Sequence, residues 1–285
     1  MKIYELNGKI IAEDTEHFNL SDTFESGQYL NFNKLGEDDF ETVAFGKYLR
    51  AYQSGNKIYF ETSMKDFNCT WRSFFDLDRD YKYIFEKLRQ DEILKKASDF
   101  CPGLRILKQE PFECLIAFII SQNNNIPRIK KIVARLCENF GAAIPYGSCD
   151  NQESRYAFPS AEKLAGLNLE DLSVIKSGFR AKYILDAAKK INSGEIQLDL
   201  IYNLNIKDGA EYLKKINGVG DKVSACVLLF AYNKLEAFPI DVRIRKILER
   251  YYPDGFNFGE YAGIANAYLF NYDNNIKRLE KNDKR

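Results

Sequence analysis

The sequence predicts an α+β protein, with an antiparallel β-sheet at the N-terminus followed by a helical body. Within the first hundred residues, apolar and polar side chains alternate between Gly- and Asn-containing turns, which is typical of β-hairpins. The pattern changes near Trp71, and from about Tyr81 apolar residues recur every three or four positions, which is the helical period. We therefore expect an antiparallel β-domain over residues 1–98 and a helical domain over residues 99–285.

Two hairpins are predicted within the β-domain. The first has strands at Lys2–Leu6 and Lys9–Ile11, joined by an Asn-Gly turn. The second has strands at Thr42–Tyr52 and Lys57–Thr62, joined by a loop at Gln53–Asn56. Gly and Asn favour these turns because both residues tolerate a positive φ.

Three helices of the body can be placed from their apolar spacing and their end signals. One starts near Pro127 and ends at Gly141, because proline suits the first turn of a helix and glycine suits its end. The others cover residues 184–191 and 242–251. The segment 141–159 resembles an irregular connection. The apolar stripe of the first helix is formed by Ile129, Ile132, Val133, Leu136 and Phe140.

Composition excludes several classes of protein. The 285 residues are 45% hydrophobic and 29% charged, an ordinary globular balance that excludes wholesale disorder. No run of eighteen apolar residues occurs and the N-terminus has no apolar signal segment, so we expect no membrane partner and a cytoplasmic protein, beside the chromosomal DNA if the source is prokaryotic. The single histidine, His17, excludes HExxH zinc sites. The six cysteines form no CxxC pair, which disfavours zinc ribbons and iron–sulfur clusters, and we expect free thiols and no metal.

The charge is unevenly distributed although the formal net charge is zero. Residues 1–100 hold 14 basic against 19 acidic residues, whereas residues 101–285 hold 27 against 22. A charged surface open to solvent explains this modest asymmetry, and so does a basic C-terminal part that meets phosphates.

The segment Leu213–Cys226 carries the most specific motif. A short helix ending at Ile216 is expected to lead through Gly218-Val-Gly220 into a second helix that starts near residue 221. Two glycines allow a tight turn and leave backbone N–H groups uncovered at a helix N-terminus, which suits a phosphate. The pattern matches the helix-hairpin-helix motif that binds the DNA backbone, although a plain turn between helices has the same spacing.

Lys222 is expected in the first turn of that second helix, at the edge of an apolar stripe that includes Cys226. Partial desolvation and a nearby helix N-terminus both favour the neutral amine that a nucleophilic lysine requires. A surface lysine whose stem covers apolar residues is the alternative. Nineteen residues further on, Asp241 precedes the next helix, where it can act as an N-cap, as a carboxylate facing Lys222, or as both.

The combination of Gly-Val-Gly-Asp-Lys with Pro-Ile-Asp-Val resembles the DNA glycosylase superfamily built on a helix-hairpin-helix, a Gly/Pro-rich loop and an aspartate. Further blocks resemble its 8-oxoguanine DNA glycosylases of eukaryotic type. The resemblance implies two helical subdomains with the active site between them, behind an N-terminal antiparallel sheet. Because Lys222 fills the lysine position, it also implies a bifunctional glycosylase and AP lyase without a cofactor. The blocks are Ser26–Gln28, Gly103–Leu115, Ser121–Arg128, Ser177–Tyr183 and Tyr261–Phe270.

The resemblance also implies how the DNA is opened. Such enzymes flip the damaged nucleotide out of the duplex. By resemblance, Asn123 enters the duplex, Phe179 wedges beside the orphaned base, and Arg128 and Arg180 donate hydrogen bonds to the orphaned cytosine. Gly218, Gly220 and Arg243 would hold DNA phosphates.

Recognition of the lesion follows from one hydrogen atom. Guanine N7 accepts a hydrogen bond, whereas N7 of 8-oxoguanine carries a hydrogen, so one carbonyl oxygen can separate them. The resemblance assigns this carbonyl to Gly27, places Cys226 and Phe270 on either face of the base, and places Asn266 where relatives usually use glutamine to read its Watson–Crick edge. Lys222 and Asp241 would be catalytic.

The expected partner is therefore double-stranded DNA containing 8-oxoguanine opposite cytosine, bound by a monomer. Two alternatives remain at this point, since an endonuclease III-type enzyme would need a four-cysteine cluster after Cys226, where the sequence has no cysteine. An alkylated-base glycosylase of the same superfamily would need only Asp241. A non-catalytic helix-hairpin-helix module would use Gly218 and Gly220 but would give Lys222 and Asp241 no shared role.

Overall fold

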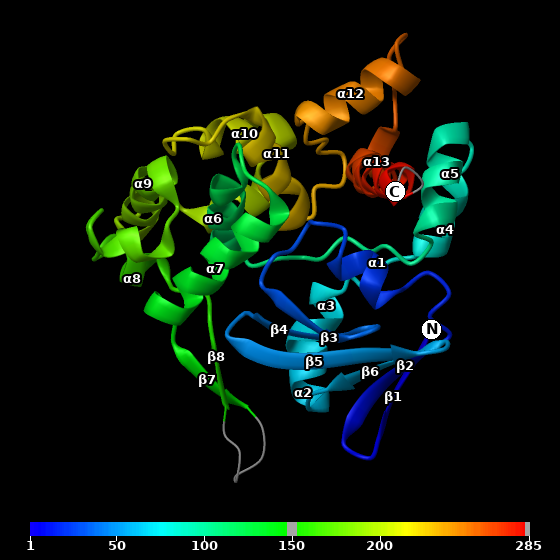
Figure 1. Cartoon of the computed structure of the whole chain (residues 1–285), viewed down its shortest axis with the longest axis horizontal. Coiled ribbons are helices and arrows are strands. Elements are labelled where there is room, and N and C mark those ends of the chain that lie inside the picture. Colours follow the sequence, from blue (N-terminus) through cyan, green and yellow to red (C-terminus); the bar gives the residue numbers. More distant parts are fainter. Residues whose placement is uncertain (147–152, 283–285) are drawn as a thin grey trace. The chain divides into compact units, whose positions relative to one another are not determined.

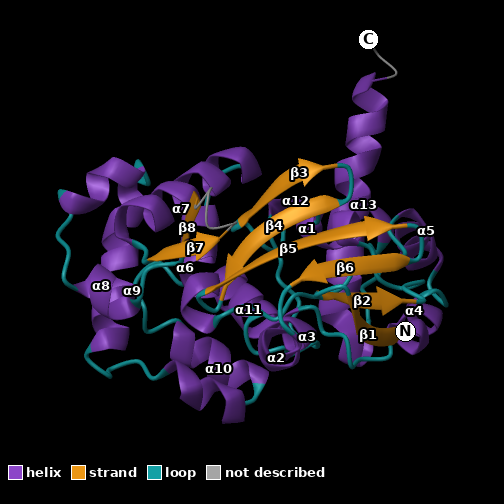
Figure 2. Cartoon of the chain, turned by 90° about the horizontal axis from the view of Figure 1, so that it is seen from below, coloured by secondary structure: helices purple, strands orange, loops and turns teal. Residues whose placement is uncertain are grey.

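The computed structural model describes residues 1–146 and 153–282, and the chain has the expected α+β architecture. Figure 2 shows a six-stranded sheet in the order β1-β2-β6-β5-β4-β3, and a separate two-stranded sheet. The strands are β1 (Lys2–Leu6), β2 (Lys9–Glu13), β3 (Phe32–Gly36), β4 (Asp39–Ala44), β5 (Lys47–Ser54), β6 (Lys57–Glu61), β7 (Ala143–Tyr146) and β8 (Glu153–Tyr156).

The helices include every helix that the sequence predicts. They are α1 (Leu20–Phe24), α2 (Met64–Asp66), α3 (Arg72–Phe74), α4 (Tyr81–Leu88), α5 (Glu92–Phe100), α6 (Pro111–Ser121), α7 (Ile126–Phe140), α8 (Ala161–Ala165), α9 (Ala181–Asn192), α10 (Ile206–Leu213), α11 (Asp221–Phe230), α12 (Val242–Tyr251) and α13 (Ala262–Asn282). Among the described residues, no helix is both long enough and apolar enough to cross a membrane. The cysteines are free thiols as expected, except that Cys149 lies outside the described residues.

Two predictions about the strands are wrong. The single strand expected over residues 42–52 is two strands, β4 and β5, which turn at Phe45 and Gly46. Both turn residues have a positive φ, 52° and 70°, and the apolar run through them concealed the turn. The irregular connection expected over residues 141–159 contains β7 and β8, which pair antiparallel from Ala143 opposite Tyr156.

The described contacts divide the chain into two compact units. Unit 1 contains residues 1–28, 51–108 and 233–285, and unit 2 contains residues 29–50 and 109–232. Neither unit is continuous in the sequence. The domain boundary expected at residues 98–99 stays a prediction.

The core of unit 1 is aromatic. Phe75 is fully buried and lies 5.4–5.8 Å, centroid to centroid, from the rings of Phe18, Phe24 and Phe60. In the same unit, β2 pairs with both β1 and β6, and α5 packs beside α13, as Figure 1 shows.

The core of unit 2 is built around α6. Residues 112–120 of this helix are all buried, and α7, α9 and α11 pack against it. A helix that is apolar on every side is stable only when other elements surround it. The start of α7 confirms the prediction made from Pro127, which lies in its first turn, and Asn125 caps the helix by accepting a hydrogen bond from the Arg128 backbone N–H at 3.0 Å.

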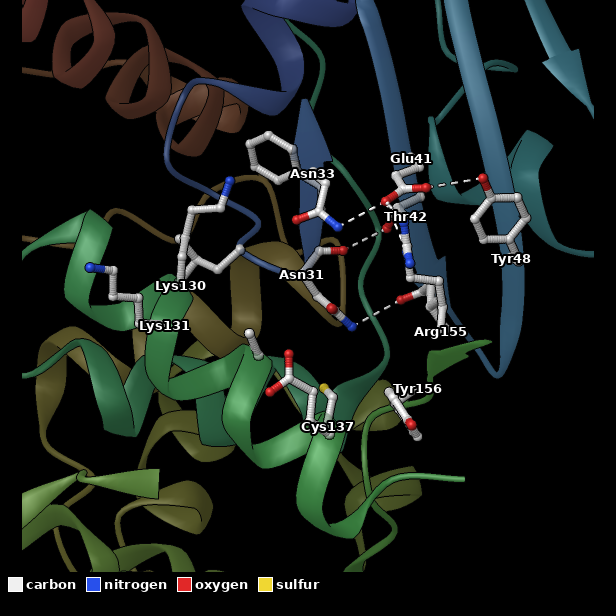
Figure 3. A pocket seen from close by; sticks show the side chains of 15 residues that line it. Asn31, Asn33, Glu41, Thr42, Tyr48, Lys130, Lys131, Cys137, Arg155 and Tyr156 are labelled. Carbon is white, nitrogen blue, oxygen red and sulfur yellow. Dashed lines mark hydrogen bonds and ion pairs between the residues drawn. The ribbon is translucent and has the colours of Figure 1, made fainter. Parts of the chain in front are cut away.

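A hollow of about 270 Å³ in unit 2 lies among β3, β4, β5, α7 and β8 (Figure 3). On the sheet side of its lining, Glu41 is 3% exposed, and its carboxylate accepts hydrogen bonds from Asn33, Tyr48 and Arg155. Tyr48 also stacks on Tyr146, with 4.4 Å between ring centroids. These polar groups satisfy one another's hydrogen bonds and attach β7 and β8 to the sheet. We therefore assign the hollow's lining a structural role and not a binding role.

Candidate DNA-binding and active site

The helix-hairpin-helix loop connects α10 to α11. The first helix ends at Leu213, three residues before the predicted Ile216, and a turn covers the difference. Gly218 has φ +84°, and a Cβ atom there would lie 2.5 Å from Cγ of Tyr183. Glycine is therefore required at this position for two reasons: its backbone conformation is left-handed, and the Tyr183 ring leaves no room for a Cβ atom.

Gly220 differs from Gly218, because no neighbour among the described residues requires it to be glycine. Its φ is −108°, which any residue adopts, and a Cβ atom there would meet none of their atoms within 4 Å. It is also the N-cap of α11 and supplies no capping side chain, so the first N–H groups of the helix have no such partner. The absence of a side chain at Gly220 lets an anion come close to the backbone at this helix N-terminus.

Lys222 is half-buried in the first turn of α11. Its Nζ donates a hydrogen bond to Ser121 Oγ at 3.2 Å and lies 4.8 Å from the ring centroid of Phe118. Phe118 in turn stacks on Phe230, with 5.5 Å between ring centroids. Cys226, one turn after Lys222, is 3% exposed. The amine is thus held at the edge of an aromatic and apolar surface by one hydroxyl acceptor.

The proposed wedge residues lie in two turns of unit 2. Asn123 is exposed in the turn between α6 and α7 with φ 46°, and Arg128 is exposed in the first part of α7. Phe179 is 52% exposed in the 3₁₀ turn Gly178–Arg180. Arg180 is 2% exposed, and its guanidinium donates to backbone carbonyl oxygens. The side chains of Asn123, Arg128 and Phe179 are therefore accessible to a ligand, whereas that of Arg180 is not.

Unit 1 holds the expected carboxylate. Asp241 is the N-cap of α12, where its Oδ1 accepts from the backbone N–H groups of Arg243 at 2.9 Å and Ile244 at 2.8 Å. The Arg243 guanidinium lies 4.6 Å from the ring centroid of Phe270 on α13. Asn266 is one turn before Phe270, and its Nδ2 donates to the Pro239 carbonyl at 2.8 Å. The unit thus brings these predicted residues of α12 and α13 together.

Gly27 lies in a loop of unit 1 that is held firmly on both sides. Its φ is +85°, which favours glycine. The Ser26 hydroxyl donates to the Thr23 carbonyl at 2.8 Å. The buried amide of Gln28 donates to the Arg105 carbonyl at 2.7 Å and accepts from the Leu107 backbone N–H at 2.8 Å. These bonds give the Gly27 carbonyl a defined direction.

The predicted site residues are therefore positioned by two groups of elements, each within one unit. Sequence reasoning gave no role to Ser121, Phe118 or Tyr183, although the first and third stand inside the quoted motifs. Ser121 lies 101 positions before Lys222, so no local spacing connects them. Unit 2 positions Asn123, Arg128, Phe179, Arg180, Gly218, Gly220, Lys222 and Cys226, and unit 1 positions Gly27, Asp241, Arg243, Asn266 and Phe270.

A glycine-rich loop that leads into a helix without a capping side chain, followed by a half-buried lysine, is typical of helix-hairpin-helix DNA-binding proteins. Two family models match the chain: 8-oxoguanine DNA glycosylase, N-terminal domain, over residues 10–115, and HhH-GPD superfamily base excision DNA repair protein, over residues 116–255. Together with the relatives below, these matches establish that the chain belongs to the 8-oxoguanine DNA glycosylase family.

Its relatives include three proteins of known name. A probable N-glycosylase/DNA lyase of Methanothermobacter thermautotrophicus is 32% identical over 70% of this chain and 72% of its own length. The N-glycosylase/DNA lyase of Saccharomyces cerevisiae is 36% identical over 68% of this chain, which spans only 54% of the yeast protein. The Clostridium acetobutylicum 8-oxoguanine glycosylase/lyase, solved with DNA containing cytosine opposite 8-oxoguanine, is 35% identical over 97% of this chain and 99% of that one, with a TM-score of 0.91.

Proposed function

We propose that the protein excises 8-oxoguanine opposite cytosine from duplex DNA and then cleaves the strand as an AP lyase. The observation that carries this proposal is the position of Lys222. This residue lies in the first turn of α11, two residues after Gly220, the N-cap that supplies no capping side chain, and its amine is held by Ser121. A phosphate held by that helix N-terminus would bring the sugar–phosphate backbone to the amine. A plain DNA-binding hairpin would not need an amine held at an apolar edge.

The reaction begins at the sugar. The Lys222 amine attacks C1′, the bond between C1′ and N9 breaks, and the base leaves with the bonding electrons and takes up a proton. The nitrogen then gives up a proton and its lone pair forms a double bond to C1′ as the C1′–O4′ bond breaks. O4′ takes up a proton to become a hydroxyl, which leaves a protonated Schiff base between Nζ and C1′. Removal of a C2′ proton expels the 3′-phosphate and nicks the strand. The proposed chemistry uses no metal or organic cofactor.

Asp241 has the proposed role of stabilising positive charge that develops on the sugar as the base departs. Its Oδ1 accepts two backbone hydrogen bonds, which fix the position of the carboxylate. Arg243, at the start of the same helix, is proposed to hold a phosphate, and Gly218 and Gly220 hold another. Asp241 would thus act both as the N-cap of α12 and as the carboxylate that stabilises the departing base's transition state.

Lesion recognition is proposed to depend on the carbonyl of Gly27. A carbonyl oxygen accepts the N7–H of 8-oxoguanine and repels the lone pair of guanine N7. The fixed loop around Gly27 supports this role, because a carbonyl free to rotate would discriminate less well. Cys226 and Phe270 would cover the faces of the base, and Asn266, already bonded to Pro239, would contact its edge.

Borohydride trapping tests the proposed chemistry. The substrate is a labelled duplex with one 8-oxoguanine opposite cytosine, and unmodified, uracil and thymine-glycol duplexes serve as comparisons. We expect a covalent adduct on the 8-oxoguanine duplex alone. Lys222→Gln should abolish the adduct and excision but keep lesion binding, whereas Lys189→Gln, an exposed lysine on α9, should behave as the native protein.

Each contrary result has a definite meaning. An adduct on a different duplex would keep the lysine chemistry and change the substrate. An adduct or full excision by Lys222→Gln would remove the lysine from the mechanism. DNA binding without any product would favour the non-catalytic module.

We further propose that the protein acts as a monomer on chromosomal DNA in the cytoplasm. Analytical ultracentrifugation with and without a lesion duplex tests the first part, and a 2:1 complex at stoichiometric DNA would contradict it.

A further inference from the structure

One face of α9 contacts the helix-hairpin-helix loop. Tyr183, Asp186 and Lys190 are spaced three and four residues apart, so their side chains project from the same side of this helix. Each of them contacts a different residue of the segment 215–218, which lies between α10 and α11. The loop that is proposed to bind a DNA phosphate is therefore supported by a helix outside the motif.

Asp186 binds the loop with both of its carboxylate oxygens. Its Oδ2 accepts from the backbone N–H of Asn217 at 2.8 Å, and its Oδ1 accepts from the side-chain Nδ2 of the same residue at 2.7 Å. The Asp186 side chain is only 21% exposed, so these bonds are partly shielded from water. Hydrogen bonds to a carboxylate are stronger than those between neutral groups. The residue directly before Gly218 is thus fixed through its backbone and its side chain.

Lys190 holds the beginning of the same loop. Its Nζ donates to the Lys215 carbonyl at 2.6 Å and lies 3.3 Å from Oδ2 of Asp186. Carbonyl groups at the end of a helix lack intrahelical partners and favour a cation, and Lys215 lies just beyond the end of α10. Lys190 also compensates the negative charge that Asp186 brings to a loop proposed to bind anions.

The loop benefits from this support because its glycines do not define one conformation. Glycine has more backbone conformations available than any other residue and loses more entropy when it is fixed. Gly218 and Gly220 therefore let a phosphate approach closely, but they leave an unsupported loop free to move. A site that is already ordered binds more tightly, because no ordering cost accompanies binding.

We propose that Asp186 is a positioning residue that holds the helix-hairpin-helix loop in its phosphate-binding conformation before DNA binds. This inference rests on the proposed function, because it assumes that Gly218 and Gly220 hold a DNA phosphate. It gives a role in DNA binding to a residue that carries the same sign of charge as DNA. Asp186 acts on DNA only through Asn217.

The charge of Asp186 makes the sign of the effect decisive. If Asp186 contributed only its charge, its removal would reduce repulsion of the phosphates and strengthen DNA binding. If Asp186 positions the loop, its removal weakens binding, because the loop must then be ordered by the DNA. Ordering about one residue corresponds to a loss of affinity of roughly 5- to 30-fold.

Fluorescence anisotropy with a labelled undamaged duplex, at one salt concentration, measures this affinity. Asp186→Ala should bind roughly 5- to 30-fold more weakly than the native protein. Asp186→Asn keeps one acceptor oxygen and should lie between the two. Glu195→Gln is the matched control, because it removes one negative charge 4.0 Å from the same Lys190 amine. This control should bind as tightly as the native protein or more tightly.

Two readouts separate positioning from a general loss of stability. Asn217→Ala removes only the side-chain bond, so its loss of affinity should be smaller, and the double variant with Asp186→Ala should bind no more weakly than Asp186→Ala alone. Single-turnover excision of 8-oxoguanine at saturating protein should fall much less than the affinity, because the loop acts in binding. Circular dichroism melting shows whether each variant is folded, and Asp186→Asn serves if Asp186→Ala is not.

Two results would overturn the inference. One is native or tighter DNA binding by the folded Asp186 variants, which would leave this residue no role beyond its charge. The other is a fully additive loss of affinity in the double variant, because Asp186 would then not act through Asn217. If the native protein binds DNA but excises 8-oxoguanine from no duplex, the proposed function fails, and the affinities still decide the role of Asp186.

Discussion

Replacing Glu113 with glutamine should stabilise the protein by an amount that grows with pH. Glu113 lies in the first turn of α6, is 4% exposed, and its Oε1 has no hydrogen-bond partner among the described residues. Burial, and then the charge of Glu110, raise the pKa of Glu113 to about 8, although hydrogen bonds with Asn31 and Tyr29 oppose the shift. At neutral pH the folded protein therefore holds a proton that the unfolded chain releases.

The sign of the effect follows from the direction of the shift. A carboxyl whose pKa is raised on folding costs no stability below its unfolded pKa of 4.5, and it destabilises the fold progressively as the pH rises to about 8. One pKa unit corresponds to about 1.4 kcal/mol, so the cost reaches about 3 kcal/mol at pH 7 and roughly 5 kcal/mol above pH 8. Glutamine has the same shape and does not titrate, so it removes this cost.

Urea denaturation followed by circular dichroism at pH 5, 7 and 9 measures the difference. We expect Glu113→Gln and the native protein to be similar at pH 5 and to diverge at pH 7 and 9. Glu138→Gln, an exposed glutamate on α7, is the matched control and should show no such divergence. A Glu113→Gln variant whose advantage is the same at all three pH values, or which is less stable at pH 9, would refute the reasoning.

Three further predictions concern the site. Gly218→Ala should lower the free energy of unfolding by about 1–3 kcal/mol, because this position has a φ of +84° and the Tyr183 ring lies beside it. Gly220→Ala should instead melt at the same temperature as the native protein but bind DNA more weakly. The slope of log affinity against log salt concentration should fall by about one phosphate contact. Ser121→Ala should leave the fold intact and slow borohydride trapping, because the Lys222 amine loses the hydroxyl that holds it in place; an unchanged trapping rate would deny the contact a role. Asp241→Asn should keep the helix cap and the melting temperature but slow single-turnover excision, and native excision by this variant would exclude a charge role.

Local features of the chain were predictable from the sequence. The limits of α7 follow from Asn125, a proline in the first turn and Gly141, and α12 begins after its cap Asp241 as expected. The two glycines of the helix-hairpin-helix were placed by spacing alone. These features depend on residues a few positions apart, and their energies come from hydrogen bonds and backbone conformation within one turn.

Features that depend on distant residues were not predictable. The turn at Phe45 and Gly46 sits inside an apolar run, and only the pairing of β4 with its neighbours shows where the strand ends. Strand β8 pairs with β7 across an interval of several residues, and its Arg155 reaches Glu41, which is 114 positions away. Strand pairing of this kind is set by packing and register and not by the local alternation of residue types.

The sequence by itself determined the fold class, the helix-hairpin-helix and the identity of the residues that carry the proposed chemistry. Tertiary structure alone decided what surrounds them. It placed Ser121 beside the Lys222 amine and buried Arg180 under the Asn123 turn, where a sequence motif indicated a contact with DNA. The physical reason is that burial and hydrogen-bond partners arise from packing between segments distant in the chain. A motif therefore defines the chemistry of each of its residues but not which groups those residues will contact.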